Sequence, residues 1–275
     1  MNIENLVKQA TSGNKVALEG LTVAIQDDIY YLALRILVNP DDAMDATQDI
    51  LIKVITNLSS FRFESKFKTW VYRLAANYLL SEKKVLNKDL GLTFDLYKMA
   101  LEGDLQEPVE LRNRPDYQVL LNELRISCTM AMLLCLKLPH RMAYILGDIM
   151  EMEHDEASQI LSISKDNFRK QLSRARNKVT EFTATSCGLV STNAKCSCDK
   201  KITGCISKQR VDPNNIYFSG EGQYSYNDVK KSLSETTQQL KTISMQKLVK
   251  QHKCPIELSK IIDSLVTEGI NSNHH

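Results

Sequence analysis

The stretch from Phe61 to Lys84, FRFESKFKTWVYRLAANYLLSEKK, decides how the sequence is interpreted. Its second half repeats apolar residues at spacings of three and four, which predicts a helix with one buried stripe. The stripe consists of Phe67, Trp70, Val71, Leu74, Ala75 and Tyr78. The opposite face carries Lys68, Tyr72, Arg73, Asn77, Ser81 and Lys84. Such a helix, preceded by Phe61 and Phe63, suits single-stranded nucleic acid, because cations neutralise phosphates and rings receive unstacked bases. The alternative is an ordinary amphipathic helix with a solvated basic face.

Two helices are predicted ahead of this stretch. The first runs from about Lys15 to Val38, and Asn39-Pro40 ends it. The second runs from about Asp41 to Leu58, with Asn39 as its N-cap and Pro40 in its first turn. The exposed face of this second helix is polar and mostly acidic, and consists of Asp42, Asp45, Gln48, Asp49 and Lys53.

A second helical domain is predicted from residue 117. Residues 85–116 contain several glycines and prolines and are mildly acidic, so we expect a linker there, with a weak helical pattern from Phe94 to Leu101. The turn Ser162-Ile163-Ser164 then joins two amphipathic segments, about His154 to Leu161 and Lys165 to Phe182, which predicts a helix-turn-helix with Ser164 as the cap of the second helix. The predicted buried stripe of that second helix consists of Phe168, Leu172, Ala175 and Val179. Cations on the second segment suit the DNA major groove. The alternative is a four-helix domain with a charged surface helix.

Two blocks of the sequence resemble the extracytoplasmic-function group of bacterial RNA polymerase sigma factors. Trp70 to Asn77, WVYRLAAN, with Phe61-Arg62 ahead of it, is similar to conserved region 2. LPHRMAYIL, from Leu138, and EASQILSISKDNFRKQLSRARNKV, from Glu156, are similar to region 4. The resemblance covers roughly Leu18 to Phe182 and implies an all-α fold. The expected domains are region 2 at 1–84, the linker at 85–116, region 4 at 117–183 and a Cys-containing extension at 184–275.

The resemblance implies a factor that directs core RNA polymerase to promoters and helps to melt them. DDAMDATQDILIKV, with Asp42, Asp45, Gln48, Asp49 and Lys53, is the implied polymerase-docking helix. The implied contacts to the minus-ten element are Arg62, Phe63, Lys66, Lys68, Trp70, Tyr72, Arg73 and Asn77. Those to the minus-thirty-five element are Lys165, Arg169, Lys170, Ser173 and Arg174. An anti-sigma factor or another regulator is a further candidate partner. Ser162 replaces the usual turn glycine, and Glu151 to His154 lacks the customary Gly-Leu-Ser, so the promoter sequence stays undetermined.

The extension contains four closely spaced cysteines, Cys187, Cys196, Cys198 and Cys205. They could bind zinc or a redox-active soft metal, or form a reversible disulfide, and lysines nearby would lower their pKa values. The alternative is four unconnected thiols. A subset of these sigma factors has a comparable segment, which implies a regulatory or folding role. No other cofactor is expected. Apolar residues from Tyr224 onward predict two or three short helices, separated at Cys254-Pro255.

Composition and motifs narrow the classes of protein to which this chain could belong. The 275 residues carry a net charge of +2, so nucleic-acid contacts must come from local patches. We expect no signal peptide and no membrane span, and seven cysteines in such a chain favour reduced thiols in the cytoplasm. An enzyme is disfavoured, because His154-Asp155-Glu156 lacks a second histidine and no glycine-rich phosphate loop occurs. The main rival is a helix-turn-helix regulator that binds duplex DNA without polymerase; it would not need the acidic face.

Overall fold

The computed structural model describes residues 3–81, 91–219, 224–249 and 252–255. These residues form helices joined by loops, without a named strand among them, so the predicted all-α class is confirmed. The chain divides into two compact units. One consists of Met1–Glu82, Gln159–Ser162 and Gln251–His275, and the other of Lys83–Ser158 and Ile163–Lys250. Each unit is described by itself.

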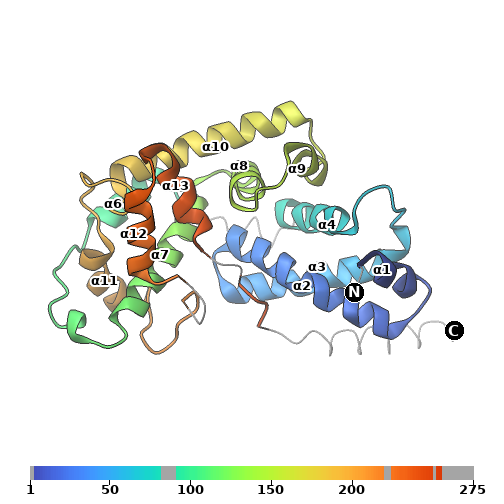
Figure 1. Ribbon diagram of the computed structural model, residues 1–275, viewed down its shortest axis with the longest axis horizontal. Helices are drawn as coiled ribbons and strands as arrows, with labels where there is room; N and C mark the ends of the chain where they lie inside the picture. Colours follow the sequence, from blue (N-terminus) through green and yellow to red (C-terminus); the bar gives the residue numbers. More distant parts are fainter. Residues whose placement is uncertain (1–2, 82–90, 220–223, 250–251, 256–275) are drawn as a thin grey trace. The chain divides into compact units, whose positions relative to one another are not determined.

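The first unit is a helical bundle centred on α2, Lys15–Leu37. The other elements are α1 (Ile3–Thr11), α3 (Pro40–Thr56), the short η1 (Leu58–Ser60) and α4 (Phe67–Ser81) (Figure 1). Helix α2 contacts α1, α3 and α4, and its second half is buried on every side from Ile29 to Ile36. A helix that is apolar all round belongs at the centre of a bundle.

The predicted break between α2 and α3 is confirmed. Helix α2 ends at Leu37, and its C-cap Val38 has a left-handed backbone conformation, φ 58°. The side chain of Asn39 accepts a hydrogen bond of 2.9 Å from the backbone N–H of Asp42, and Pro40 begins α3. The cap satisfies one of the backbone donors that a helix start leaves unpaired, and Pro40 has no N–H to lose.

In the second unit, α7 (Tyr117–Ala131) and η3 (Met132–Cys135) precede α8 (Leu138–Tyr144), which continues as the π-helical η4 (Ile145–Ile149). The guanidinium of buried Arg141 donates to the carbonyl oxygens of Leu133, Leu134 and Leu136 at 3.0, 3.1 and 3.1 Å. These carbonyls lie at the end of η3, where the helix supplies no further backbone N–H group to bond them. Arg141 therefore fixes the direction in which the chain leaves η3 and enters α8.

Helix α9 (His154–Ile160) and α10 (Lys165–Ser186) form the predicted helix-turn-helix. The turn closes with two backbone hydrogen bonds, from Ser162 to Gln159 (3.2 Å) and from Ile163 to Ser158 (3.1 Å). This pair is a Schellman motif, whose C′ residue is left-handed and usually glycine. Ser162 occupies that position with φ 53°, so the serine accepts strain that a glycine would avoid. Ser164 caps α10, as predicted, by accepting from Asn167 at 3.2 Å.

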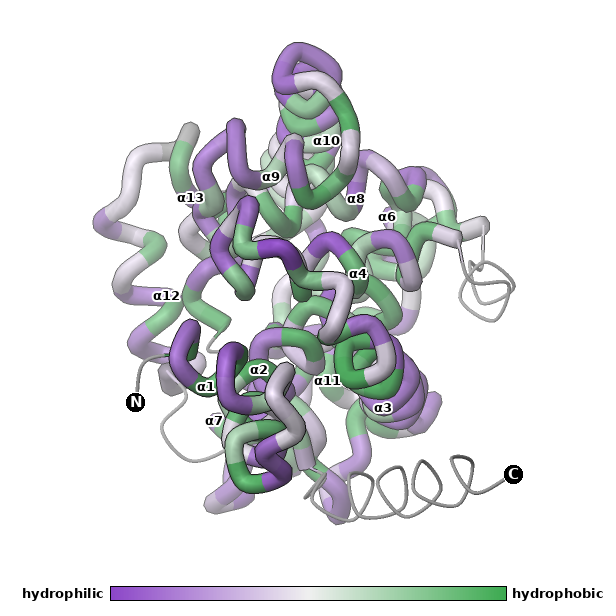
Figure 2. The backbone as a smooth tube through the Cα atoms, turned by 90° about the vertical axis from the view of Figure 1, so that its right-hand side faces the viewer, coloured by the Kyte–Doolittle hydropathy of each residue, from purple (hydrophilic) through white to green (hydrophobic). Residues whose placement is uncertain are grey.

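Helix α10 packs on α8 through the predicted stripe of Phe168, Leu172, Ala175 and Val179, all buried. Hydrophilic and hydrophobic residues mix along α10 in Figure 2. A bidentate ion pair, Arg176 Nε and Nη2 to Asp148 at 2.9 and 2.6 Å, adds a fixed contact beside this stripe. Asp148 is buried, so its pairing with Arg176 avoids an uncompensated charge.

The expected linker is structured where it is described. Residues 94–102 form α6 (Phe94–Glu102) and 111–113 form η2 (Leu111–Asn113), both within the second unit. The rings of Phe94 and Tyr97 lie 5.0 and 5.7 Å from that of Phe182, and the Tyr97 hydroxyl donates to the Cys128 carbonyl at 2.9 Å. The aromatic side chains of α6 therefore pack against α7 and α10.

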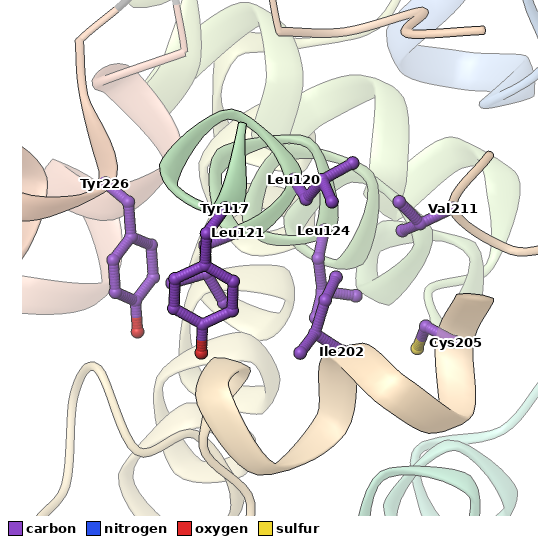
Figure 3. Close-up of a cluster of buried hydrophobic side chains, with 8 residues drawn as sticks. All are labelled: Tyr117, Leu120, Leu121, Leu124, Ile202, Cys205, Val211 and Tyr226. Atoms are coloured by element: carbon purple, nitrogen blue, oxygen red, sulfur yellow. The ribbon is translucent and has the colours of Figure 1, made fainter. Parts of the chain in front are cut away.

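Residues 184–250 of the extension also belong to the second unit and add α11 (Cys198–Ser207), α12 (Tyr226–Glu235) and α13 (Gln238–Lys247). Figure 3 shows the apolar cluster that joins it to α7. The cluster consists of Tyr117, Leu120, Leu121, Leu124, Ile202, Cys205, Val211 and Tyr226. Residues 256–275, where the last predicted helix falls, lie outside the described residues.

A buried carboxylate holds one loop of the extension. Glu123 on α7 accepts hydrogen bonds from the backbone N–H groups of Tyr217, Phe218 and Ser219, at 3.0, 2.8 and 2.6 Å. Burial raises the pKa of Glu123, and the three donors oppose that rise. The loop at 217–219 is thus attached to α7 by charge-assisted hydrogen bonds.

The extension contacts residues 100–107 by a row of lysines. The buried ammonium group of Lys201 donates to the carbonyl oxygens of Ala100 (2.6 Å) and Gly103 at the end of α6. Lys208 pairs with Asp104, and Lys195 with Glu102 at 3.5 Å. Gly204 completes this contact: a Cβ there would lie 2.9 Å from both the Cβ and the carbonyl oxygen of Asp104.

One described segment, Tyr117–Cys135, is long and apolar enough to cross a membrane by length and composition. Most of its residues are buried inside the second unit, as in the core helix of a soluble protein.

Gly204→Ala is expected to destabilise the second unit by about 1–3 kcal/mol, because its methyl group would press α11 against the backbone at Asp104. Gly103→Ala is the control, since a Cβ at Gly103 meets only Met99 O at an ordinary 3.5 Å. Thermal and urea unfolding of both variants would show the difference. Equal stabilities would contradict the close approach of the two segments.

Candidate nucleic-acid and polymerase interfaces

Four aromatic rings gather between η1 and α4. The centroid of the Phe61 ring lies 4.7 Å from that of Phe63, 5.4 Å from Phe67 and 5.4 Å from Trp70. Phe61 and Phe67 are buried, whereas the Phe63 side chain is 47% exposed and Trp70 is partly exposed. The cluster therefore has a buried base and an accessible edge.

The backbone at Phe63 has φ 58°, in the left-handed region that bulky residues rarely occupy. The strain is tolerated where surrounding packing fixes the conformation, and such outliers concentrate at ligand-binding sites. Around Phe63 stand cations: Arg62 and Lys66 are exposed, and Lys8 Nζ lies 6.0 Å from the Phe63 ring centroid. An aromatic platform surrounded by positive charge has the chemistry to hold an unstacked base and its phosphate.

Helix α4 turns a somewhat different face inward from the one predicted. Tyr72, expected on the donor face, is buried at 7% exposure, so it does not lie where DNA could reach its ring. Trp70, expected in the buried stripe, shares an open face with Arg73 and exposed Asn77, at helical spacings of three and four. The spacing of apolar residues could not show that Trp70 is the more exposed of Trp70 and Tyr72. The structure buries both residues that follow Trp70, Val71 and Tyr72.

Lys68 is exposed but already has a partner. Its ammonium group lies 2.6 Å from Asp28 Oδ2 on α2. An exposed pair of this kind contributes little stability, so it could exchange for a phosphate at small cost. Lys84 lies outside the described residues.

The predicted polar face of α3 is present. Asp45 and Lys53 are exposed, and Asp42, Gln48 and Asp49 are partly exposed. Asp49 also accepts a hydrogen bond of 2.6 Å from the Tyr78 hydroxyl, and so ties α3 to α4. Asp49 therefore has a structural role in addition to any surface role.

On α10, Arg169, Lys170, Ser173 and Arg174 are exposed as predicted. Lys165 is partly buried and pairs with Asp155 at 2.6 Å, which joins the start of α10 to α9. Arg169 lies 3.9 Å from Asp166, a loose contact that leaves its guanidinium available. The free donors thus lie beyond the first turn of α10.

Sequence reasoning missed a group of cations that α8 and α10 bring together. Burial lowers the pKa of His140, and the charges of Lys178, Arg174 and Lys137 lower it further. His140 therefore lies within electrostatic range of all three. The residues are far apart in the chain, and only the packing of α8 on α10 extends the positive surface of Arg174 toward Lys137 and Lys178.

Burial outweighs the expected effect of the lysines on the thiol pKa values. Burial raises the pKa values of Cys187, Cys198 and Cys205, and raises that of Cys196 to about 11. Lys201 lowers the pKa of Cys196 and Cys205, but burial outweighs it. Lys195 and Lys201 instead bind the acidic side chain and carbonyls of residues 100–103.

Three of the four predicted thiols, those of Cys187, Cys196 and Cys198, line one cavity. Cys205 belongs to the apolar cluster on α7, whereas Cys128 lines a cavity with Cys187, Cys196 and Cys198. Within the described part of the chain, no three His, Cys, Asp or Glu side chains converge in a way that could hold a metal ion. Cys128 was not predicted to join these thiols, because it lies in α7, far from the extension in the sequence.

Comparison with known proteins reveals similarity to one family. The family described as Sigma-70 region 2 matches residues 21–86. The ECF RNA polymerase sigma factor SigW of Bacillus subtilis is 28% identical over 178 residues, which are 64% of this chain and 94% of SigW. The ECF RNA polymerase sigma-E factor of Escherichia coli K12 is 27% identical over 179 residues, which are 63% of this chain and 90% of the relative.

A solved structure also matches: the sigma factor RpoE in complex with the anti-sigma factor NepR from Bartonella quintana. It has 19% sequence identity and a TM-score of 0.38, and the match covers 58% of this chain and 91% of that one. More than a third of this chain has no counterpart in the SigW match.

The thiol of Cys196 is expected to react slowly with iodoacetamide in the folded, metal-free protein. A pKa of about 11 in place of 9.0 leaves it protonated to higher pH, so its thiolate fraction at pH 8 falls about a hundredfold. The rate should rise about tenfold per pH unit from 7 to 9. Mass spectrometry of the peptide containing Cys196, with urea-unfolded protein as control, would measure it. Equal folded and unfolded rates would refute the burial argument.

Proposed function

Because the chain belongs to the extracytoplasmic-function group of RNA polymerase sigma factors, we propose that its two helical units contact core polymerase and both promoter elements. The protein acts as a transcription initiation factor: it directs the polymerase to specific promoters and assists their melting. We propose that it does so in the cytoplasm and contributes no catalytic residue of its own. An anti-sigma factor or another regulator as partner stays a proposal.

The observation that carries the assignment of DNA melting is the aromatic cluster at Phe61, Phe63, Phe67 and Trp70. A base that leaves the duplex stack costs a few kcal/mol. Stacking on an aromatic side chain returns about 1–3 kcal/mol per base, and phosphate contacts add to it. Phe63, held in a strained conformation with its ring exposed, supplies such a platform. Arg62, Lys66 and Trp70 would flank the captured base, and Arg73 and Asn77 would line the strand that follows.

Recognition of the upstream element is proposed for α10. Its packing on α8 leaves Arg169, Lys170, Ser173 and Arg174 on the exposed side. Arg and Lys can donate to guanine edges in the major groove, and Ser can donate or accept. Lys165 is paired with Asp155, so its proposed contribution is to a phosphate and not to a base edge.

Polymerase docking is proposed for the polar face of α3. Asp45 is exposed and Asp42 and Gln48 are partly exposed, on a helix whose other side is buried against α2. Charged residues on such a rigid surface give orientation and speed to association more than affinity. Asp49 contributes from the same face while it also holds Tyr78.

Phe63→Ala is expected to reduce promoter opening about 5- to 150-fold, the equivalent of losing about 1–3 kcal/mol of stacking. Phe63 is about half exposed, so the fold should survive. Val23→Ala, a second exposed apolar side chain of the same unit, is the matched control. Permanganate reactivity of unpaired thymines in the polymerase–promoter complex would report opening. Normal promoter opening with the Phe63→Ala variant would contradict the proposal that Phe63 is a stacking platform.

Asp45→Lys is expected to weaken co-purification with core RNA polymerase, because it reverses a charge on the docking face. Asp49 is left unchanged, since its substitution would also break the contact with Tyr78. Glu235→Lys on α12, an exposed acid in the other unit, has the same charge change and should bind normally. If both variants lose binding, net charge and not a docking face decides the interaction. If the wild type binds duplex DNA but not polymerase, the independent regulator is favoured.

A further inference from the structure

The last described residues of the chain return to the first unit. Residues 252–255 belong to the same compact unit as α2, although α13 before them belongs to the other unit. The backbone N–H of Cys254 donates a hydrogen bond of 2.9 Å to Asp27 Oδ1 on α2. Burial of Tyr30 and its closeness to Cys254 raise the pKa of the tyrosine hydroxyl to about 12. Cys254 therefore lies against α2 beside Asp27 and Tyr30.

The side of α2 that Cys254 contacts continues as an exposed apolar stripe. Val16, Val23, Asp27 and Tyr30 follow one another at helical spacings of seven, four and three, so they share one side of the helix. Tyr30 is buried and Asp27 partly buried, whereas Val23 is 62% and Val16 is 75% exposed. A lone exposed valine is ordinary. Two of them in line with an attached segment indicate a surface that the continuation of that segment can cover.

The residues that follow Cys254 have a pattern suited to this stripe. Residues 256–275, IELSKIIDSLVTEGINSNHH, lie outside the described residues. Their sequence repeats apolar residues at spacings of three and four, which predicts an amphipathic helix. Pro255 suits the first turn of such a helix, where its missing N–H is not needed. The apolar positions of the predicted helix are Leu258, Ile261, Ile262 and Leu265.

The lengths of the two segments match. From Asp27 back to Val16, α2 extends roughly 16 Å, and a helix over residues 256–267 is about 18 Å long. An isolated helix of this length is marginal in water, and packing of its apolar side supplies the missing stability. A short tether also gives the segment an effective concentration of about a millimolar or more at α2. The tether therefore favours this segment over a second copy of the chain.

We propose that residues 256–267 fold as an amphipathic helix, the clasp, that packs antiparallel on α2 over Val23 and Val16. The hydrogen bond from Cys254 to Asp27 fixes where the clasp begins, and the antiparallel direction follows because Val23 and Val16 lie before Asp27 in α2. The apolar side of the clasp removes both valines from water. This inference is independent of how either unit engages DNA or polymerase.

The test is hydrogen–deuterium exchange of the full chain, measured by mass spectrometry on peptides that cover residues 256–267. We expect exchange there at least tenfold slower than in an isolated peptide of the same sequence. Val23→Asp should remove most of this protection, because it places a charge under the apolar side of the clasp. Val119→Asp makes the same change at an exposed valine on α7, in the other unit, and should leave the protection intact.

Variants of the clasp itself and of the far end of the stripe sharpen the test. Leu265→Asp should speed exchange at least fivefold, whereas Thr267→Asp, on the opposite side of the predicted helix, should not. Val16→Asp should speed exchange mainly in residues 263–267, as antiparallel packing requires. Val23→Ala keeps an apolar side chain under the clasp and should retain the protection.

Melting curves show whether each variant is otherwise folded; if Val23→Asp is not, Leu265→Asp and its control decide alone. Wild-type exchange as fast as in the isolated peptide would overturn the proposal. So would protection that survives Val23→Asp, equal losses in the control variants, or release at residues 256–259 by Val16→Asp. Protection that rises with protein concentration would assign the stripe to a second copy of the chain and would overturn the proposal as well.

Discussion

The ammonium group of Lys201 is the contact on which the architecture of the second unit depends. It is buried, and it donates to the carbonyl oxygens of Ala100 and Gly103 at the point where α6 ends. A buried cation is costly unless it is fully bonded, and the unpaired carbonyls of a helix end are suitable acceptors. The chain therefore gains from placing α11 against α6. Gly204 permits the approach, and Glu123 attaches the next loop to α7. Sequence segments that would otherwise be a linker and a tail become parts of one folded body.

The first unit follows a different constraint. Helix α2 is buried on all sides from Ile29 to Ile36, so it has to be surrounded, and α1, α3 and α4 contact it. The surfaces proposed for function are the sides of α3 and α4 that this packing leaves exposed. At Phe63 an unfavourable left-handed backbone conformation coincides with an exposed aromatic ring. That combination of strain and exposure is what separates a binding platform from an ordinary amphipathic helix.

Local chemistry could be predicted from the sequence where a few neighbouring residues decide the outcome. Asn39 and Pro40 had to start α3, and Ser164 had to cap α10, because backbone donors at helix starts need a partner close in sequence. The exposed donors of α10 followed from its clear stripe. Prediction failed where contacts between segments far apart in the sequence determine burial or binding. Tyr72 is buried because α4 has neighbours on more than one side, and Cys128 lines the cavity because α7 packs beside the extension. Likewise, the lysines of the extension bind residues 100–107 and do not activate thiols, a choice that no local pattern reveals.

The most direct test of the account is promoter-dependent transcription in a reconstituted system. Core RNA polymerase would be combined with the full chain and with genomic DNA fragments, and the 5′ ends of the transcripts would be mapped. The account predicts transcripts that begin at defined positions, only when the chain is present, downstream of shared upstream and melting elements. Specific binding of the chain to duplex DNA without such transcripts would contradict it.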